Sequence, residues 1–198
     1  MIMAKMPVLG RVKTRLARQV GGAQAVRFVR ATLAALLRRL ARDPRFETIV
    51  AVASTQDLAS RMIPPHVRRL HQRGGDLGQR MTHLAHVAPA GPVVIVGTDI
   101  PGITADVIAR AFAMLGRADV VLGPAGDGGY WLLGFSRRHP PPRHLSGVRW
   151  SSEHALADTI TVLGPRVIGI TDQLADVDTA AELHRLGAAA GRTIPPRN

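Results

Sequence analysis

The chain has 198 residues, of which 46% are hydrophobic and 20% are charged, so it can bury a sizeable core and does not have the composition of a disordered protein. The absence of cysteine excludes disulfide scaffolds, thiolate zinc sites and cysteine nucleophiles. A formal charge of +12 favours an anionic ligand such as a nucleotide. We expect one domain over residues 1–198, in the cytoplasm and without a membrane span, because no apolar stretch approaches about 20 residues.

Strands and helices are predicted to alternate along the chain. In order, the pattern predicts strand 1–4, a loop, helix 22–42, strand 47–53, a short helix 56–62, strand 67–71, helix 76–87, strand 93–97, helix 104–115 capped by Thr104, strands 119–123 and 130–135, a helix capped by Ser151 or Ser152 that runs to 163, strand 167–171 and helix 179–190. This alternation predicts an α/β fold, a three-layer αβα sandwich around a mostly parallel mixed sheet of about seven strands. Because ligands bind at the carboxyl ends of such strands, the loops that follow them should carry the function.

The loop after the first strand holds both lysines of the chain, Lys5 and Lys13, with Arg15 close behind. Gly10 permits close approach of the backbone, and the cations can reach phosphate oxygens. The Walker pattern is absent from this loop. Either these cations bind phosphate or they are solvated surface charges, and their spacing leaves both interpretations open.

Acidic residues stand at two further positions that a ligand could reach. Asp99 follows strand 93–97, where a carboxylate can hold magnesium that bridges phosphates; a turn or a helix cap is the alternative. Asp176 and Asp178 lie on one side of the chain if this segment is extended. Either of them can also cap the last helix.

Two glycine-rich segments complete the candidate site. Residues 123–131, GPAGDGGYW, combine an Asp-Gly hairpin signal with glycines and aromatic rings that suit a small polar ligand. Residues 72–81, QRGGDLGQRM, place glycines ahead of a helix whose amide-rich start can face an anion.

Five motifs carry a resemblance to a known family. They are KxPxxGxVKTRL at 5–16, GDLGxRM at 75–81, GTDxP at 97–101, GPAxDGGYW at 123–131 and DVDT at 176–179. In this order they resemble the DUF2064 family of glycosyltransferase-like proteins, in the nucleotide-diphospho-sugar transferase superfamily of the GT-A fold. The resemblance runs from Lys5 to about Leu183, although strand 1–4 is shorter than the family's usual first strand. More distantly, three of the segments are similar to 2-phospho-lactate guanylyltransferases and molybdenum-cofactor nucleotidyltransferases.

The resemblance implies a role for each matching residue. Gly10, Lys13 and Arg15 would contact the phosphates of the donor; Gln72, Gly78 and Arg80 would lie near its base and ribose; Gly128, Gly129 and Tyr130 would shape the acceptor side. Asp99 would bind Mg²⁺ or Mn²⁺, with Asp178 completing the metal site. Asp99, Lys13 and Asp127 are the catalytic candidates.

We therefore predict a magnesium-dependent transferase with a nucleotide-activated donor and a small-molecule acceptor, here glycosyl transfer from a nucleoside diphosphate sugar. Nucleotidyl transfer from a nucleoside triphosphate to a small phosphorylated acceptor, with release of pyrophosphate, is the alternative. A basic nucleic-acid-binding module without catalysis is a third hypothesis, although dispersed arginines and 4% aromatic residues disfavour it. Arg143, His144 and Arg149 suggest that the acceptor is anionic.

Overall fold

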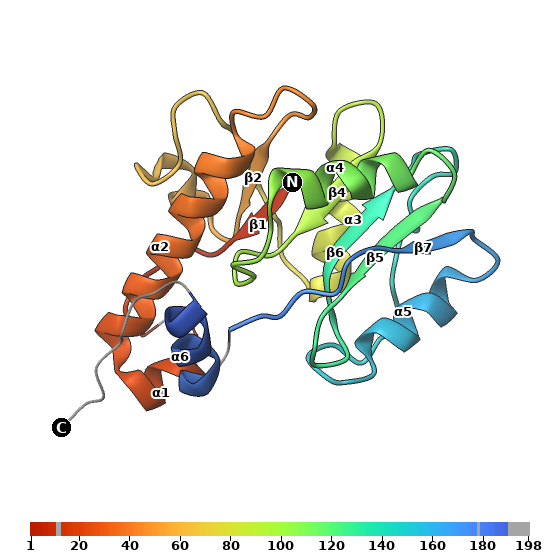
Figure 1. The fold of residues 1–198 in the computed structure, drawn as a ribbon. Helices are drawn as coiled ribbons and strands as arrows, with labels where there is room; N and C mark the ends of the chain where they lie inside the picture. Colours follow the sequence, from red (N-terminus) through yellow and green to blue (C-terminus); the bar gives the residue numbers. More distant parts are fainter. Residues whose placement is uncertain (11–12, 178, 190–198) are drawn as a thin grey trace.

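The computed structural model describes residues 1–10, 13–177 and 179–189 (Figure 1). Its strands are β1 (Ile2–Ala4), β2 (Ile49–Val52), β3 (Arg68–His71), β4 (Val93–Val96), β5 (Val120–Pro124), β6 (Tyr130–Phe135) and β7 (Ile168–Ile170). They form one sheet in the order β3-β2-β1-β4-β6-β5-β7, in which β6 pairs antiparallel with β4 and β5 while the other described pairs are parallel. The predicted α/β fold with a mostly parallel mixed sheet is confirmed.

Helices cover both faces of this sheet. They are α1 (Thr14–Val20), α2 (Gly22–Leu40), the 3-10 helix η1 (Thr55–Ala59), α3 (Leu77–Val87), α4 (Ala105–Met114), α5 (Ala155–Leu163) and α6 (Ala180–Ala189). One hydrophobic cluster packs α2 and α4 against the sheet, and a second packs α3 and α5 against the opposite face. A smaller cluster joins α1, α2 and α6.

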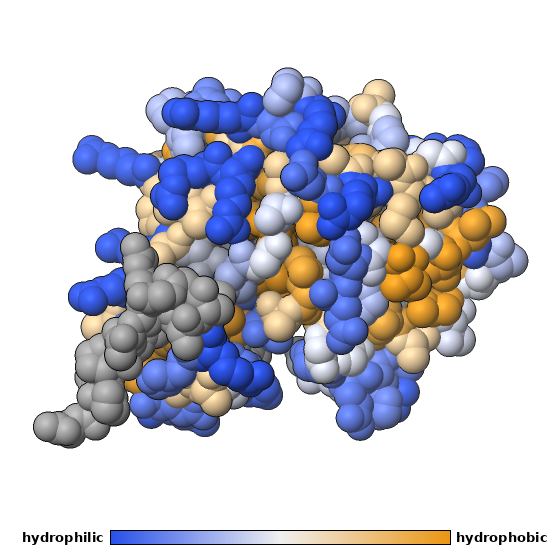
Figure 2. Space-filling view, in the orientation of Figure 1, coloured by the Kyte–Doolittle hydropathy of each residue, from blue (hydrophilic) through white to orange (hydrophobic). Residues whose placement is uncertain are grey.

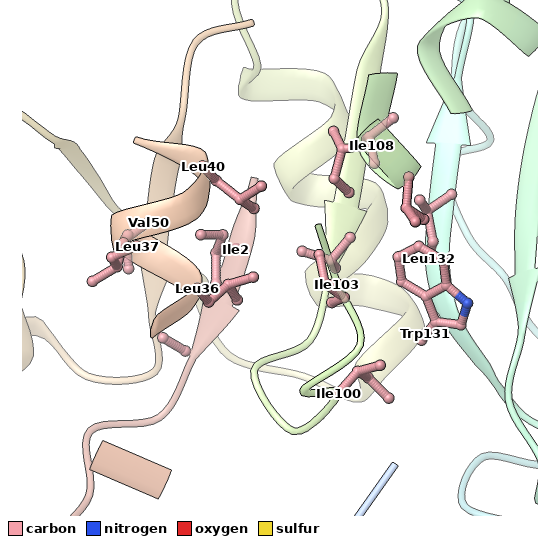
Figure 3. Packing of buried hydrophobic residues seen from close by; sticks show 14 of the residues in the cluster. Ile2, Leu36, Leu37, Leu40, Val50, Ile100, Ile103, Ile108, Trp131 and Leu132 are labelled. Atoms are coloured by element: carbon pink, nitrogen blue, oxygen red, sulfur yellow. The ribbon is translucent and has the colours of Figure 1, made fainter. Parts of the chain in front are cut away.

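The longest helix, α2, shows how the sequence separates core from surface. Leu33, Leu36, Leu37 and Leu40 are buried at helical spacing, and Figure 3 shows Leu36 and Leu40 packed towards Ile2 of β1. The outer face of the helix carries arginines, and hydrophilic side chains gather over α2 in Figure 2. This apolar stripe beneath a charged face is the usual pattern of a surface helix.

Three predicted features differ in the structure. Helix α1 occupies residues assigned to a loop, because it is only seven residues long and buries just Leu16 and Val20, too few for a periodic signal. The helix predicted at 56–62 is the 3-10 helix η1. Helix α5 begins at Ala155 without a side-chain cap, so the cap predicted at Ser151 or Ser152 is wrong.

The start of α5 is completed by the backbone instead. The carbonyl of Gly128 accepts the N–H of Leu156 at 3.1 Å, and the carbonyl of Ser152 accepts the N–H of Ala155 at 3.2 Å. These bonds satisfy amides that a capping side chain would otherwise bind. The glycine-rich turn between β5 and β6 is thereby tied to the first turn of α5.

No helix among the described residues has the length and hydropathy needed to cross a membrane.

The predicted cap at Thr104 is confirmed, since its hydroxyl accepts the N–H of Val107 at 3.3 Å. We expect Thr104→Ala to lower the free energy of unfolding by about 1 kcal/mol, because α4 loses a bond to one of its unpaired amides. Thr104→Ser keeps the hydroxyl and should change it less, as measured by urea unfolding. Equal losses in the two variants would assign the effect to the methyl group and not to the cap.

Candidate active site

A cavity of about 540 Å³ opens at the carboxyl edge of the sheet. Its walls come from the residues that follow β1 to β4, from the turn between β5 and β6, and from α1, α3 and the start of α5. Of the residues singled out from the sequence, Arg15, Gln72, Arg80, Asp99, Asp127, Gly129, Tyr130 and Asp176 line it. Segments far apart in the chain therefore meet at one place.

Asp99 lies at the centre of this edge, three residues after Val96, the last residue of the buried strand β4. Its side chain is 44% exposed, and its Oδ2 accepts a hydrogen bond from Lys13 Nζ at 3.0 Å, across 86 residues of sequence. A Cβ on Gly97 would lie 2.9 Å from Asp99 Oδ1, so glycine leaves room for the carboxylate. Arg39 holds the loop beyond it by donating to the carbonyls of Pro101 and Ile103.

Lys13 owes its position to an unusual backbone. It has φ 46° and ψ 53°, in the left-handed region, immediately before α1, and its side chain is only 12% exposed. Arg15 follows in the first turn of α1 and is exposed to the cavity. Gly10 does not line the cavity, and its φ of 76° gives it a turn-forming role.

Two residues expected near the base and ribose have structural contacts. The buried amide of Gln72 donates to the carbonyls of Ala51 at 2.7 Å and Ala4 at 3.3 Å, so it ties β1 and β2 together. A Cβ on Gly78 would lie 2.6 Å from Trp150 Cζ2, so this glycine lets the indole pack on the first turn of α3. Arg80 also lines the cavity, and it donates to the backbone carbonyl of Asp76 at 3.2 Å and to the side-chain oxygen of Gln72 at 3.4 Å.

The turn between β5 and β6 is built around Asp127. Its Oδ1 accepts the N–H of Gly129 at 2.9 Å, and Gly129 in turn accepts the N–H of Ala125 at 3.0 Å. Gly128 has φ 82°, and a side chain there would collide with the backbone of Glu153. Gly128 thus docks the turn on α5, while Asp127 stays exposed at the cavity.

Tyr130 begins β6 and presents its ring to the cavity. Its ring meets that of Trp150 edge to face, with centroids 6.4 Å apart, and Thr159 Oγ1 donates to its hydroxyl at 3.3 Å. Burial raises the pKa of Tyr130 from 10.0 to about 12, against the opposing effect of the bond from Thr159. The phenol is therefore neutral at physiological pH.

Asp99 and Asp176 supply carboxylate oxygens to the same cavity. Asp178, the second metal ligand implied by the resemblance, lies outside the described residues, and no group of three or more His, Cys, Asp or Glu side chains that could hold a metal occurs among the residues described. Mg²⁺ is usually held by one or two carboxylates together with substrate phosphates and water. The oxygen donors present fit such a metal, bound together with phosphates.

Comparison with known proteins agrees with the resemblance. A family model described as an uncharacterized protein conserved in bacteria, DUF2064, matches residues 36–152, more than half of the chain. The chain belongs to the DUF2064 family. No curated protein matches it.

Solved structures with this fold include transferases. A Desulfovibrio desulfuricans G20 protein, provisionally named a nucleotide-diphospho-sugar transferase, is 28% identical with a TM-score of 0.87, over 95% of this chain and 85% of that one. The 4-diphosphocytidyl-2C-methyl-D-erythritol synthase of Anaerococcus prevotii DSM 20548 is 11% identical with a TM-score of 0.60, over 96% of each chain. A Mycobacterium tuberculosis H37Rv protein in complex with manganese is 15% identical with a TM-score of 0.54, over 93% and 95%. The last two show the fold alone.

Several residues line the cavity for which the sequence assigns no definite binding or catalytic role. They are Thr98, Trp150, Ser151 and Ser152. Trp150 lies in a segment without a recognisable motif, where the sequence fits either the core or a lid over the acceptor pocket, and for the two serines the sequence indicates only a helix cap. Lys5, one of the cations of the first loop, also lines the cavity. Gly78 is the one local signal of Trp150, because a glycine in the first turn of a helix leaves room for a bulky side chain from elsewhere in the chain.

We expect Lys13→Met to strengthen the binding of Mn²⁺ alone by roughly two- to fivefold, because Asp99 loses a competing cation whose ion pair is worth up to about 1 kcal/mol. Electron paramagnetic resonance of free Mn²⁺ measures the change. Lys5→Met removes an equal charge from a residue that lines the cavity and has no described bond to Asp99, so it serves as the control. An equal gain in both variants, or none in Lys13→Met, would contradict a specific role for the ion pair.

Tyr130 is the single tyrosine of the chain, so its ionisation can be followed directly by ultraviolet absorbance. We expect the folded protein to form tyrosinate near pH 12 and the unfolded protein near 10. Between these values the folded state keeps a proton that the unfolded state has lost, so the free energy of unfolding falls as the pH rises. Thr159→Val should raise the pKa further, since it removes a bond that favours the phenolate. Ionisation of the folded protein near pH 10 would show an open, hydrated phenol.

Proposed function

We propose that this DUF2064 chain is a metal-dependent glycosyltransferase that uses a nucleoside diphosphate sugar as donor. One observation carries the proposal: the Asp99 carboxylate and the cations Lys5, Arg15 and Arg80 line a single cavity at the carboxyl edge of the sheet. Cations and a carboxylate-bound metal are what a diphosphate requires, because its charge must be neutralised both in binding and in departure. The fold and the Desulfovibrio relative support the transferase class.

In the proposed reaction the hydroxyl oxygen of the acceptor forms a bond to the anomeric carbon of the sugar. The bond from that carbon to the diphosphate breaks, and the nucleoside diphosphate leaves with the electron pair. Arg15 and Arg80 would stabilise the leaving phosphates, and a metal at Asp99 would supply further positive charge to them. Little covalent work falls to the protein, so orientation and charge neutralisation provide most of the acceleration.

Asp127 is our candidate for the base that takes the proton of the acceptor hydroxyl. It lies on the cavity wall next to Tyr130, and the N–H of Gly129 fixes one of its oxygens at 2.9 Å. A held and exposed carboxylate can accept a proton from a hydroxyl within hydrogen-bonding distance. Catalysis by Asp127 remains a prediction for mutagenesis.

Nucleotidyl transfer is the second candidate, and the position of Lys13 and Arg15 favours it. The cluster of cations beside Asp99 would also suit the β- and γ-phosphates of a triphosphate, with pyrophosphate as the leaving group. Glycosyl transfer is preferred because the other half of the cavity is lined by Tyr130 and Trp150, as expected for a pocket that holds an uncharged acceptor.

A thermal-shift panel of nucleoside diphosphate sugars and nucleoside triphosphates, each with and without Mg²⁺ or Mn²⁺, separates these candidates. A donor present at 100 times its Kd should stabilise the protein by about 2.7 kcal/mol, a rise in Tm of roughly 5–10 °C. We expect the rise with one diphosphate sugar, only with metal, and its loss in Asp99→Asn. The control Asp106→Asn changes an exposed acid that pairs with Arg45 outside the cavity and should keep the rise.

The same panel can overturn the proposal. A metal-dependent rise with a single triphosphate and with no diphosphate sugar would instead identify a nucleotidyltransferase. No rise with any nucleotide, together with salt-sensitive binding of RNA or DNA that Asp99→Asn does not change, would leave the basic nucleic-acid-binding module. If transfer is observed, Asp99→Asn should lower its rate at least about a hundredfold.

A further inference from the structure

The cavity extends into one hydrophobic layer of the fold. Side chains along a strand alternate between the two faces of a sheet, and on β4 Ile95 belongs to the cluster under α3 and α5 whereas Val96 belongs to the cluster under α2 and α4. The apolar part of the cavity wall comes largely from the α3 and α5 side, through Met3, Met81, Ile95 and Leu133. The cavity therefore continues from the charged strand ends into the layer between α3 and α5.

Two aromatic rings border this apolar part. Trp150 is half-buried, and it packs on Gly78 and against the edge of Tyr130. The other tryptophan is different, because Trp131 is 4% exposed and its indole N–H bonds to the carbonyl of Asp172 at 3.0 Å. No hydrogen bond to the Trp150 indole N–H is found within the described residues. Trp150 therefore lines the cavity with a donor that is still available for a ligand.

The loop that carries Trp150 is fixed in place by an ion pair. Arg149 donates to both carboxylate oxygens of Asp158 on α5, at 2.9 Å each, and its backbone N–H donates to the same group at 3.0 Å. The hydrogen bonds from Arg149 hold the pKa of Asp158 well below its usual range. Arg149 is thus engaged away from the cavity, and neither Arg143 nor His144 lines it.

The charged and uncharged parts of the wall come from different segments. The cations Lys5, Arg15 and Arg80 come from the first loop, α1 and α3, while Trp150, Ser151, Ser152 and Ala155, from the loop before α5 and its first residue, add no charge. Tyr130 stays neutral there, and because its oxygen accepts from Thr159 it keeps its own proton for a ligand. The uncharged part of the wall around Tyr130 and Trp150 is therefore not suited to the anionic acceptor that Arg143, His144 and Arg149 suggest.

We propose that the acceptor is an uncharged alcohol that carries an apolar ring, with the ring held against Tyr130 and Trp150 and the hydroxyl directed towards Asp127. This inference rests on the proposed function, which identifies the part of the cavity around Tyr130 and Trp150 as the acceptor side. Aromatic walls bury apolar rings well and orient them by edge-to-face contact. The phenol and indole hydrogens can then donate to the oxygen atoms of the alcohol.

The test compares 2-phenoxyethanol with 2-methoxyethanol, which share a hydroxyl and an ether oxygen and differ in the ring. The chain has 2 tryptophans, so a nitrogen-15 spectrum of the wild-type protein shows two indole N–H signals, which Trp150→Phe assigns. We expect 2-phenoxyethanol to shift the Trp150 signal and leave that of Trp131 in place, with a Kd at least tenfold below that of 2-methoxyethanol. Trp150→Phe should bind 2-phenoxyethanol within about threefold of wild type, and Trp150→Ala at least tenfold more weakly.

An unmoved Trp150 signal, or equal affinity for the two alcohols, would overturn the inference in a folded wild-type protein. No donor is present in this experiment, so the outcome is independent of the nucleotide panel. Donor binding with an unmoved Trp150 signal refutes the acceptor class alone. A shifted signal without donor binding refutes the glycosyltransferase proposal and leaves a ring-binding pocket.

Discussion

The antiparallel strand β6, inserted between β4 and β5, determines which residues meet at the cavity. Because β6 runs against its neighbours, its first residue, Tyr130, lies at the same edge as the ends of β4 and β5. The tight turn through Asp127 is the consequence, since two adjacent antiparallel strands need only a short connection. A parallel β6 would present its last residue at this edge and remove both Asp127 and Tyr130 from the cavity. One reversal of direction thus places Asp127 and Tyr130 in the same cavity as Asp99.

Glycine makes this arrangement possible at two points, Gly128 and Gly78, neither of which lines the cavity. Gly128 allows the turn to approach Glu153 and gives its carbonyl to α5, while Gly78 allows Trp150 to lie on α3. Both helices contribute to the cavity wall, so their spacing sets its width. A methyl group at either glycine would push a helix or a loop away from the site, a strain that close-packed interiors tolerate poorly.

The features that could be predicted from the sequence are those that depend on residues close together in the chain. The buried strand shortly before Asp99, the cap at Thr104 and the Asp-Gly turn each depend on residues close together in the chain, and all three are found. Long-range contacts explain the failures. One of the two carbonyls that complete the start of α5 belongs to Gly128, which is distant in sequence. The role of Gln72 in joining β1 to β2 depends on carbonyls that no pattern in its own segment reveals.

The distribution of charge reconciles a strongly basic chain with an acidic centre. Several of the 14 acidic residues pair with arginines away from the cavity, as Asp43 and Asp106 do with Arg45, and Asp172 does with Arg110. Asp99 instead lies at the cavity, where Lys13 balances it. The surplus of arginine over the surface creates a positive field that would attract an anionic ligand over long range. In the proposed reaction, the few carboxylates at the strand ends would act only at contact, on a metal or on a proton.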